Sequence, residues 1–219
     1  MITRRAFTAI LSLAGLAAAA GLSPWRFIGT AMAQSQLAAD LAKPPSLPDM
    51  ALGPKDAAVT IVEYASMTCP HCAAFTEQVF PKLKQAYIDT NKIRFVFREF
   101  PLDIKAAAGS MLARCIAGDD PQKYFAAIHT LFKQQESWVM GKTSEQLLLI
   151  GKQAGLSEAE VDKCLKDQAL LDKIAADQKF ANEKLGVNST PSFFINGEMI
   201  KGETSFEEFE RRIKAILKT

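Results

Sequence analysis

The stretch VTIVEYASMTCPHC, residues 59–72, decides the fold, because an apolar, β-branched run ends just before two cysteines with two residues between them. The run predicts a strand, and the apolar pattern that follows predicts a helix over residues 70–89. Cys69 and Cys72 therefore lie where a strand ends and a helix begins. Two thiols in that place predict a redox centre.

The position of each cysteine on this helix gives it a different chemistry. The N–H groups of a first helical turn have no partner within the helix, and the helix dipole places partial positive charge there, so a thiolate at Cys69 is stabilised. Cys72 lies one turn further along the same face, within disulfide reach of Cys69 but hidden from solvent. We expect Cys69 to be the nucleophile and Cys72 the resolving thiol.

The two residues between the cysteines adjust this pair. Pro70 suits a first helical turn because its φ is preset and it has no N–H to lose, and His71 can add a donor or a positive charge beside the Cys69 sulfur. Both effects favour thiolate over disulfide, which makes the bridge a good electron acceptor. A structural zinc site is the alternative. Because Cys115 and Cys164 are far apart in the sequence and there are only two histidines, we expect no metal and no cofactor.

The N-terminus predicts export. Arg4 and Arg5 precede an apolar stretch over residues 9–22, and small residues before Gln34 predict cleavage after Ala33. The arginine pair resembles a twin-arginine signal, although such pairs also occur in ordinary secretory signals. A membrane anchor is the weaker alternative because a proline and an arginine interrupt the apolar region. Since all four cysteines follow residue 33, we expect an oxidising compartment, the periplasm.

The charge of the mature chain gives no reason to expect a nucleic-acid partner. Removal of residues 1–33 takes three of the 26 basic residues and none of the 24 acidic ones, which leaves a net charge of −1. The remaining 186 of 219 residues suit one domain, or one domain with an insertion.

The order of expected elements is βαβ, a helical insertion, then ββα. Residues 34–57 contain four prolines and are expected to form an N-terminal arm. The next elements are a strand at 59–65, a helix at 70–89, a strand at 93–100, helical periodicity over 102–185, strands at 192–195 and 198–201 joined by an Asn-Gly turn, and a helix at 205–217. This predicts an α/β fold with a central mixed sheet over 58–101 and 186–219, interrupted by an all-helical insertion at 102–185.

This order, with Cys-Pro-His-Cys opening the first helix and Thr190-Pro191 just before the hairpin, resembles the DsbA-like thiol-disulfide oxidoreductases of the thioredoxin superfamily. The resemblance covers nearly all of residues 52–219. It implies a thioredoxin fold in which the bond before Pro191 is cis and lies against the active-site sulfurs. The backbone of Thr190 is then open to pair with an extended substrate chain. A proline that merely begins a strand is the alternative.

The resemblance also places Glu63 as a buried acid below the disulfide, where it could relay the proton that Cys72 must lose and regain. An edge-strand carboxylate in solvent is the alternative. Cys115 and Cys164 both lie in the helical insertion, where an oxidising compartment predicts a structural disulfide, with a redox-active bridge as the alternative. His129 is expected to be a core or boundary histidine.

The leading functional hypothesis is an exported, monomeric dithiol oxidase. It passes its Cys69–Cys72 disulfide to reduced client proteins and is reoxidised by a quinone-linked membrane partner resembling DsbB. A disulfide isomerase or reductase is the second hypothesis. The third is a peptide-binding chaperone with a merely structural disulfide, which the exposed position expected for Cys69 disfavours.

Overall fold

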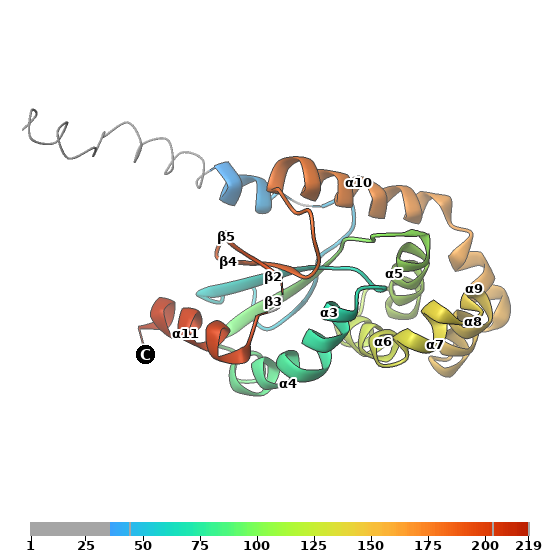
Figure 1. Cartoon of the computed structure of the whole chain (residues 1–219), viewed down its shortest axis with the longest axis horizontal. Coiled ribbons are helices and arrows are strands. Elements are labelled where there is room, and N and C mark those ends of the chain that lie inside the picture. The colour runs from blue at the N-terminus through green and yellow to red at the C-terminus, as the bar shows by residue number, and fades with distance from the viewer. Residues whose placement is uncertain (1–35, 44, 203, 219) are drawn as a thin grey trace, which may run out of the picture.

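The computed structural model describes residues 36–43, 45–202 and 204–218, so the export signal predicted for residues 1–33 lies outside the described residues. The described chain contains a five-stranded sheet in the order β1-β3-β2-β4-β5 (Figure 1). The strands are β1 (Met50–Leu52), β2 (Val59–Ala65), β3 (Ile93–Glu99), β4 (Ser192–Ile195) and β5 (Glu198–Lys201).

The strand that leads to the cysteines is the centre of this sheet. Strand β2 runs parallel to β3, and every other neighbouring pair in the described sheet is antiparallel. A parallel pair needs a crossover connection, which residues 70–88 supply on their way from β2 to β3. Because successive side chains of a strand point to opposite faces, Glu63 faces one side of the sheet and its neighbours Val62 and Tyr64 face the other. The predicted α/β fold with a mixed sheet is confirmed.

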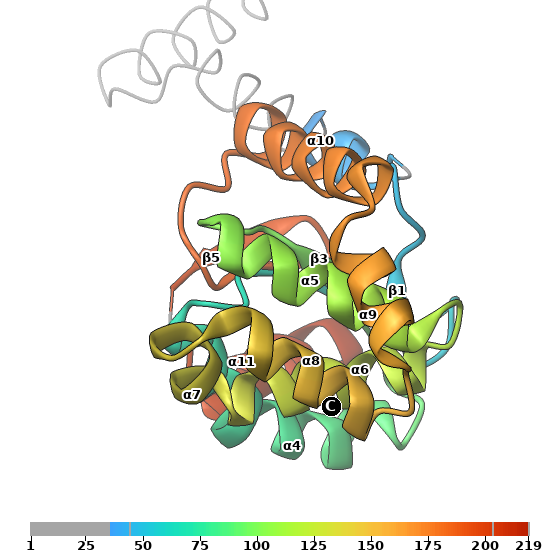
Figure 2. The same cartoon turned by 90° about the vertical axis from the view of Figure 1, so that its right-hand side faces the viewer.

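Helices cover both faces of the sheet (Figures 1 and 2). Helix α10 and a short helix at residues 36–41 lie over one face, and α3, α4 and α11 lie over the other. Helices α5 to α9 gather beside one end of the sheet and face the viewer in Figure 2. The bounds are α3 (Pro70–Ala74), α4 (Phe80–Leu83), α5 (Ile104–Ala117), α6 (Pro121–Lys133), α7 (Gln135–Met140), α8 (Thr143–Gln153), α9 (Glu158–Leu165), α10 (Gln168–Leu185) and α11 (Phe206–Leu217).

The crossover helix differs from the expectation. The sequence predicts one α-helix over residues 70–89, but two π-helical segments, η1 (Phe75–Val79) and η2 (Lys84–Ile88), follow α3 and α4 respectively. Pro81 lacks the N–H that would bond the carbonyl of Glu77 in an α-helix, which accounts for the widened turn just before it. The redox motif thus lies at the start of α3, which keeps α-helical form for five residues before η1 begins.

The N-terminal arm contains a strand that the sequence did not predict. Residues Met50–Leu52 pair antiparallel with Phe95–Phe97 of β3 and close that edge of the sheet. A strand of three residues is too short to show a periodic pattern, so only the partner strand defines this element. The hairpin strands β4 and β5 have the predicted bounds, and Asn196 and Gly197 at its turn both have positive φ, at 46° and 88°.

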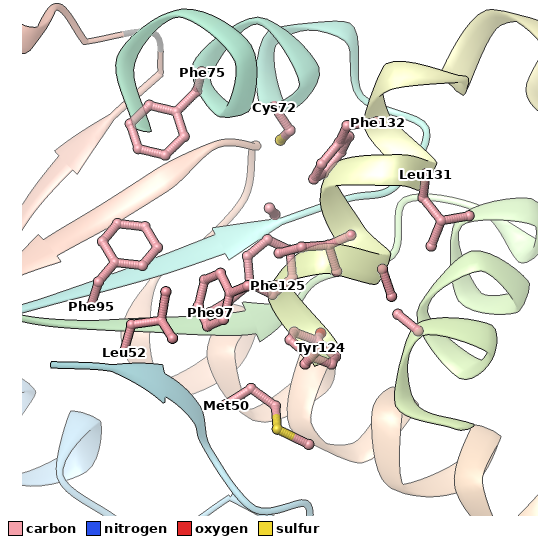
Figure 3. Close-up of a cluster of buried hydrophobic side chains, with 14 of the residues drawn as sticks. Met50, Leu52, Cys72, Phe75, Phe95, Phe97, Tyr124, Phe125, Leu131 and Phe132 are labelled. Atoms are coloured by element: carbon pink, nitrogen blue, oxygen red, sulfur yellow. The ribbon is translucent and has the colours of Figure 1, made fainter. Parts of the chain in front are cut away.

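Aromatic rings anchor the crossover to the sheet, as Figure 3 shows around Phe75 and Phe95. The ring centroid of Phe75 lies 4.6 Å from that of Phe193, 6.2 Å from that of Phe95 and 5.7 Å from that of Phe209. All four side chains are buried. Since Phe75 follows Cys72 by less than one helical turn, this packing fixes the height of the cysteine helix above the sheet.

The two remaining cysteines form a disulfide between α5 and α9, with their Cα atoms 6.2 Å apart. The neighbouring Arg114 donates to both carboxylate oxygens of Glu99 at the end of β3, and the hydroxyl of Tyr124 donates to the same carboxylate. The disulfide therefore joins two helices of a region that the buried ion pair of Arg114 and Glu99 connects to the sheet. The pairing of Cys115 with Cys164 is as the sequence predicted.

Replacement of Cys115 and Cys164 by Ala should lower the free energy of unfolding by about 2–4 kcal/mol, because the 49-residue loop regains its freedom in the unfolded chain. Denaturant unfolding of the oxidised variant and wild type measures this difference. If the bridge is structural, the glutathione equilibrium of Cys69–Cys72 is the same in both proteins. An unchanged unfolding free energy with a shifted equilibrium would overturn the structural assignment.

Candidate active site

The loop after β2 places Cys69 at the N-cap of α3, with Pro70 as the first helical residue. The Cys69 carbonyl accepts from the N–H of Cys72 at 3.1 Å and of Ala73 at 3.2 Å, which starts the helix directly at the nucleophile. Both cysteines are free thiols in this structure; Cys69 is 6% exposed and Cys72 is fully buried. Pro70 and His71 lie exposed on the first turn. Cys69 is thus buried rather than exposed as the sequence predicted, and it is only slightly more accessible than Cys72.

A distant segment completes the site. The Thr190–Pro191 bond is cis, as the resemblance implied, and it brings the Thr190 carbonyl to the cysteines from the start of β4. The Cys69 thiol donates to this carbonyl, with a sulfur–oxygen distance of 3.3 Å. Two segments 121 residues apart thus meet at the nucleophilic sulfur.

The surroundings of Cys69 favour its thiolate. A hydrogen bond from the Cys72 thiol has the largest effect, and the side chain of Thr190 and the backbone N–H groups of His71 and Cys72 add to it. Together they lower the pKa of Cys69 to about 5, against the opposing effect of partial burial. At neutral pH the reduced protein therefore carries a thiolate at Cys69.

The surroundings of Cys72 have the opposite effect. Burial, the hydrogen bond that it gives to Cys69, and the nearby charge of Glu63 raise the pKa of the Cys72 thiol. Figure 3 shows this side chain pointing from α3 toward the sheet, next to Phe132. Cys72 keeps its proton across the ordinary pH range and needs a local base before it can attack.

Glu63 can act as the base that Cys72 needs. It lies on the central strand between Phe97 of β3 and Phe193 of β4 and is only 1% exposed, so the alternative of an edge-strand carboxylate in solvent is wrong. Burial, with a smaller contribution from Cys69, raises the pKa of its carboxyl well above the usual value. Its Oε1 has no hydrogen-bond partner among the described residues. A protonated Glu63 can therefore donate a proton, and its anion can accept one.

Gln135 of α7 is a site residue that the sequence did not indicate. Its amide nitrogen donates to the carbonyls of Met67 at 2.9 Å and Cys69 at 3.0 Å, and so ties the cysteine loop to the helical region. Thr68 donates to Asp103 at the start of α5 at 2.7 Å. Neither contact has a sequence signal, because a helical Gln and an N-cap Asp are ordinary residues in such places.

The described residues contain no group of three or more His, Cys, Asp or Glu side chains placed to hold a metal ion. Cys115 and Cys164 are bonded to each other. No helix in the described part of the chain is long and apolar enough to cross a membrane.

In the reduced protein, thiolate absorbance in the ultraviolet should rise in one step near pH 5, because Cys69 ionises there. Cys69→Ala should show no such step, since burial keeps Cys72 protonated. Cys72→Ala should move the Cys69 step to higher pH, because this variant lacks the strongest donor to the thiolate. A wild-type step at the ordinary thiol pKa of about 8.5 would contradict this assignment.

Comparison with known proteins agrees with this geometry. A family model described as Thioredoxin matches residues 46–215. The chain is 33% identical to Wolbachia pipientis alpha-DsbA1, whose crystal structure superposes with a TM-score of 0.73 over 81% of this chain and 94% of that one. Oxidised BdbD from Bacillus subtilis, 24% identical, shares the fold with a TM-score of 0.69 over 78% of this chain and 94% of that one.

Among curated proteins, a Rickettsia bellii protein named as a protein-disulfide oxidoreductase is 42% identical over 150 residues. The match covers 68% of this chain and 57% of that protein. The chain thus spans little more than half the length of this relative.

Proposed function

Because the chain belongs to the DsbA-like group of the thioredoxin superfamily, we propose that it is an exported dithiol oxidase that donates its Cys69–Cys72 disulfide to folding client proteins. The observation that carries this proposal is the opposite shift of the two thiol pKa values, lowered to about 5 at Cys69 and raised at Cys72. A stabilised thiolate favours the reduced pair, so the disulfide readily accepts electrons from ordinary thiols.

The transfer begins when a client thiolate attacks the sulfur of Cys69, which is slightly more accessible than Cys72. The S–S bond between the cysteines breaks, a client–Cys69 bond forms, and Cys72 leaves with the electron pair. Glu63 supplies the proton that the buried Cys72 takes up, which its raised pKa and its position on the central strand support.

The second client thiolate then attacks the client sulfur of the mixed disulfide. The client gains its disulfide and Cys69 leaves as a thiolate, the form that its surroundings stabilise. Two electrons have passed from the client dithiol to the protein. During this step the client backbone pairs with Thr190 beside the cis bond, in the manner of an added strand.

Reoxidation needs an external disulfide, and a quinone-linked membrane protein resembling DsbB is the proposed donor. The periplasm is the proposed compartment, and a monomer without cofactor or nucleic acid is the proposed working form. An isomerase or reductase would need a donor that keeps Cys69 and Cys72 reduced. A peptide-binding chaperone would need a disulfide that does not exchange, which the low pKa of Cys69 opposes.

Exposed apolar side chains near the cysteine loop fit an unfolded polypeptide as the client. Leu102 and Ile104, 53% and 71% exposed, flank the Asp103 that binds Thr68 next to Cys69. Lys105 of α5 donates to the carbonyl of Val139, and the next residue, Met140, is 81% exposed. Large apolar groups in solvent indicate a surface that binds other chains, and unfolded clients expose such groups themselves.

Cys72→Ala should trap client polypeptides as mixed disulfides, because Cys69 still attacks but no resolving thiol remains. Cys69→Ala should trap almost none, since its remaining thiol, Cys72, is fully buried and stays protonated. Non-reducing electrophoresis after mixing each variant with a reduced, unfolded protein and its oxidised form measures the adducts. Equal trapping by the two variants would contradict the assignment of nucleophile and resolving thiol.

Leu102→Asp combined with Ile104→Asp should lower kcat/KM for oxidation of an unfolded reduced protein about tenfold, because two apolar contacts with the client are lost. The rate of reaction with dithiothreitol should stay the same, since this reductant is too small to reach both positions. Leu149→Asp on α8 is the matched control, because Leu149 is 51% exposed. Equal losses in the control and the double variant would show that this surface does not bind clients.

A further inference from the structure

A small cavity lies between η1 and α6, and Glu63 forms part of its wall. Its volume of ≈ 10 Å³, counted as room for the centre of a water-sized sphere, is about what one water molecule needs. Thr76 and His129 are the other polar residues in this wall. The rest of the lining is apolar: Phe80, Phe95, Phe97, Phe125 and Ile128.

The cavity joins a buried group to an exposed one. Glu63 is 1% exposed and Thr76 is 5% exposed, whereas His129 lies on the exposed side of α6, not in the core or at its boundary as the sequence suggested. The unpartnered Oε1 of Glu63 has no described protein donor or acceptor to pass a proton to. One water between a carboxyl group and an imidazole is sufficient for proton transfer.

Among the described residues that face Glu63, few others could carry its proton to solvent. Strands β3 and β4 present Phe97 and Phe193 on either side of it. Cys69 and Cys72 are close enough to Glu63 to interact with its charge. Helix α6 contributes Tyr124, a buried phenol whose hydroxyl already donates to Glu99, in addition to His129.

We propose that His129, with Thr76 and one cavity water, is the exit through which Glu63 exchanges protons with solvent during disulfide exchange. This inference rests on the proposed relay by Glu63 and deepens it. A client or oxidant joined to Cys69 covers the sulfur and the adjacent cis-proline loop, so the front of the site is closed when Cys72 must change its protonation state. None of Cys69, Cys72, Thr190 and Pro191 lines the cavity, so a client or oxidant bound to those residues leaves this exit open.

During reoxidation the proton of Cys72 moves outward along this route. In the mixed disulfide of Cys69 with an oxidant, Cys72 gives its proton to the Glu63 carboxylate while its sulfur attacks Cys69. The Cys69–Cys72 bond forms, the bond to the oxidant breaks, and the oxidant sulfur leaves as a thiolate with the electron pair. The proton on Glu63 then crosses the cavity water to His129 and leaves to solvent. During client oxidation a proton moves along the same route in the opposite direction, from solvent through His129 and the cavity water to Glu63.

The test follows the release of glutathione from the Cys69–glutathione mixed disulfide of the full-length protein, a first-order step in which Cys72 must lose its proton. His129→Ala should slow this step about tenfold, as loss of a proton-transfer group does. Added imidazole should restore the rate, because it fits the space left by the side chain. His129→Gln should be slow without rescue, since its side chain fills that space. Lys133→Ala on the same helix should react as wild type, and the glutathione equilibrium constant of His129→Ala should stay within twofold.

The outcomes separate this inference from the proposed relay. If Glu63→Gln slows glutathione release and His129→Ala does not, the exit through His129 is overturned while Glu63 keeps its role. Slowing in His129→Ala without rescue by imidazole also overturns it, because the histidine then acts through structure. If Glu63→Gln reacts as wild type, the relay itself is wrong. Failure of wild type to form the mixed disulfide would instead reject the dithiol oxidase.

Discussion

The stabilised thiolate at Cys69 is the interaction on which the rest of the structure depends. It exists because β2 ends where α3 begins, so that a sulfur occupies the N-cap with backbone N–H groups and the Cys72 thiol directed at it. The ring packing of Phe75 holds the helix over the sheet, and the amide of Gln135 holds the loop before it. Each of these contacts keeps donors at the one atom that must carry negative charge.

A buried carboxyl group on the central strand is the cost of this arrangement. An apolar residue at Glu63 would pack well between Phe97 and Phe193, and an unpaired acid in that place destabilises the fold whenever it ionises. The raised pKa keeps the group neutral for most of the time, which limits that cost. The same raised pKa makes the ionised carboxyl a stronger base, which favours its taking a proton from a thiol that also resists ionisation.

Local patterns predicted much of the fold and the cysteine chemistry. A β-branched run located β2, the Asn-Gly turn located the hairpin of β4 and β5, and the spacing of Cys69 and Cys72 assigned their different roles before any contact was known. Strand β1 and the π-helical turns could not be predicted, because a three-residue edge and a widened turn depend on partners far along the chain. Gln135 and the cavity at His129 share that dependence, since only packing of the helical region against the crossover brings them to the site.

The pH dependence of the glutathione equilibrium tests the stabilised thiolate most directly. Reduction of the Cys69–Cys72 disulfide by glutathione releases one proton wherever Cys69 ionises and glutathione does not. The apparent equilibrium constant for reduction should therefore be flat below about pH 5 and rise tenfold per pH unit from there toward the pKa of an ordinary thiol, about 8.5. The folded reduced state gains this stabilisation as pH rises and loses it as pH falls through 5. A constant independent of pH between 5 and 8 would contradict a stabilised Cys69 thiolate.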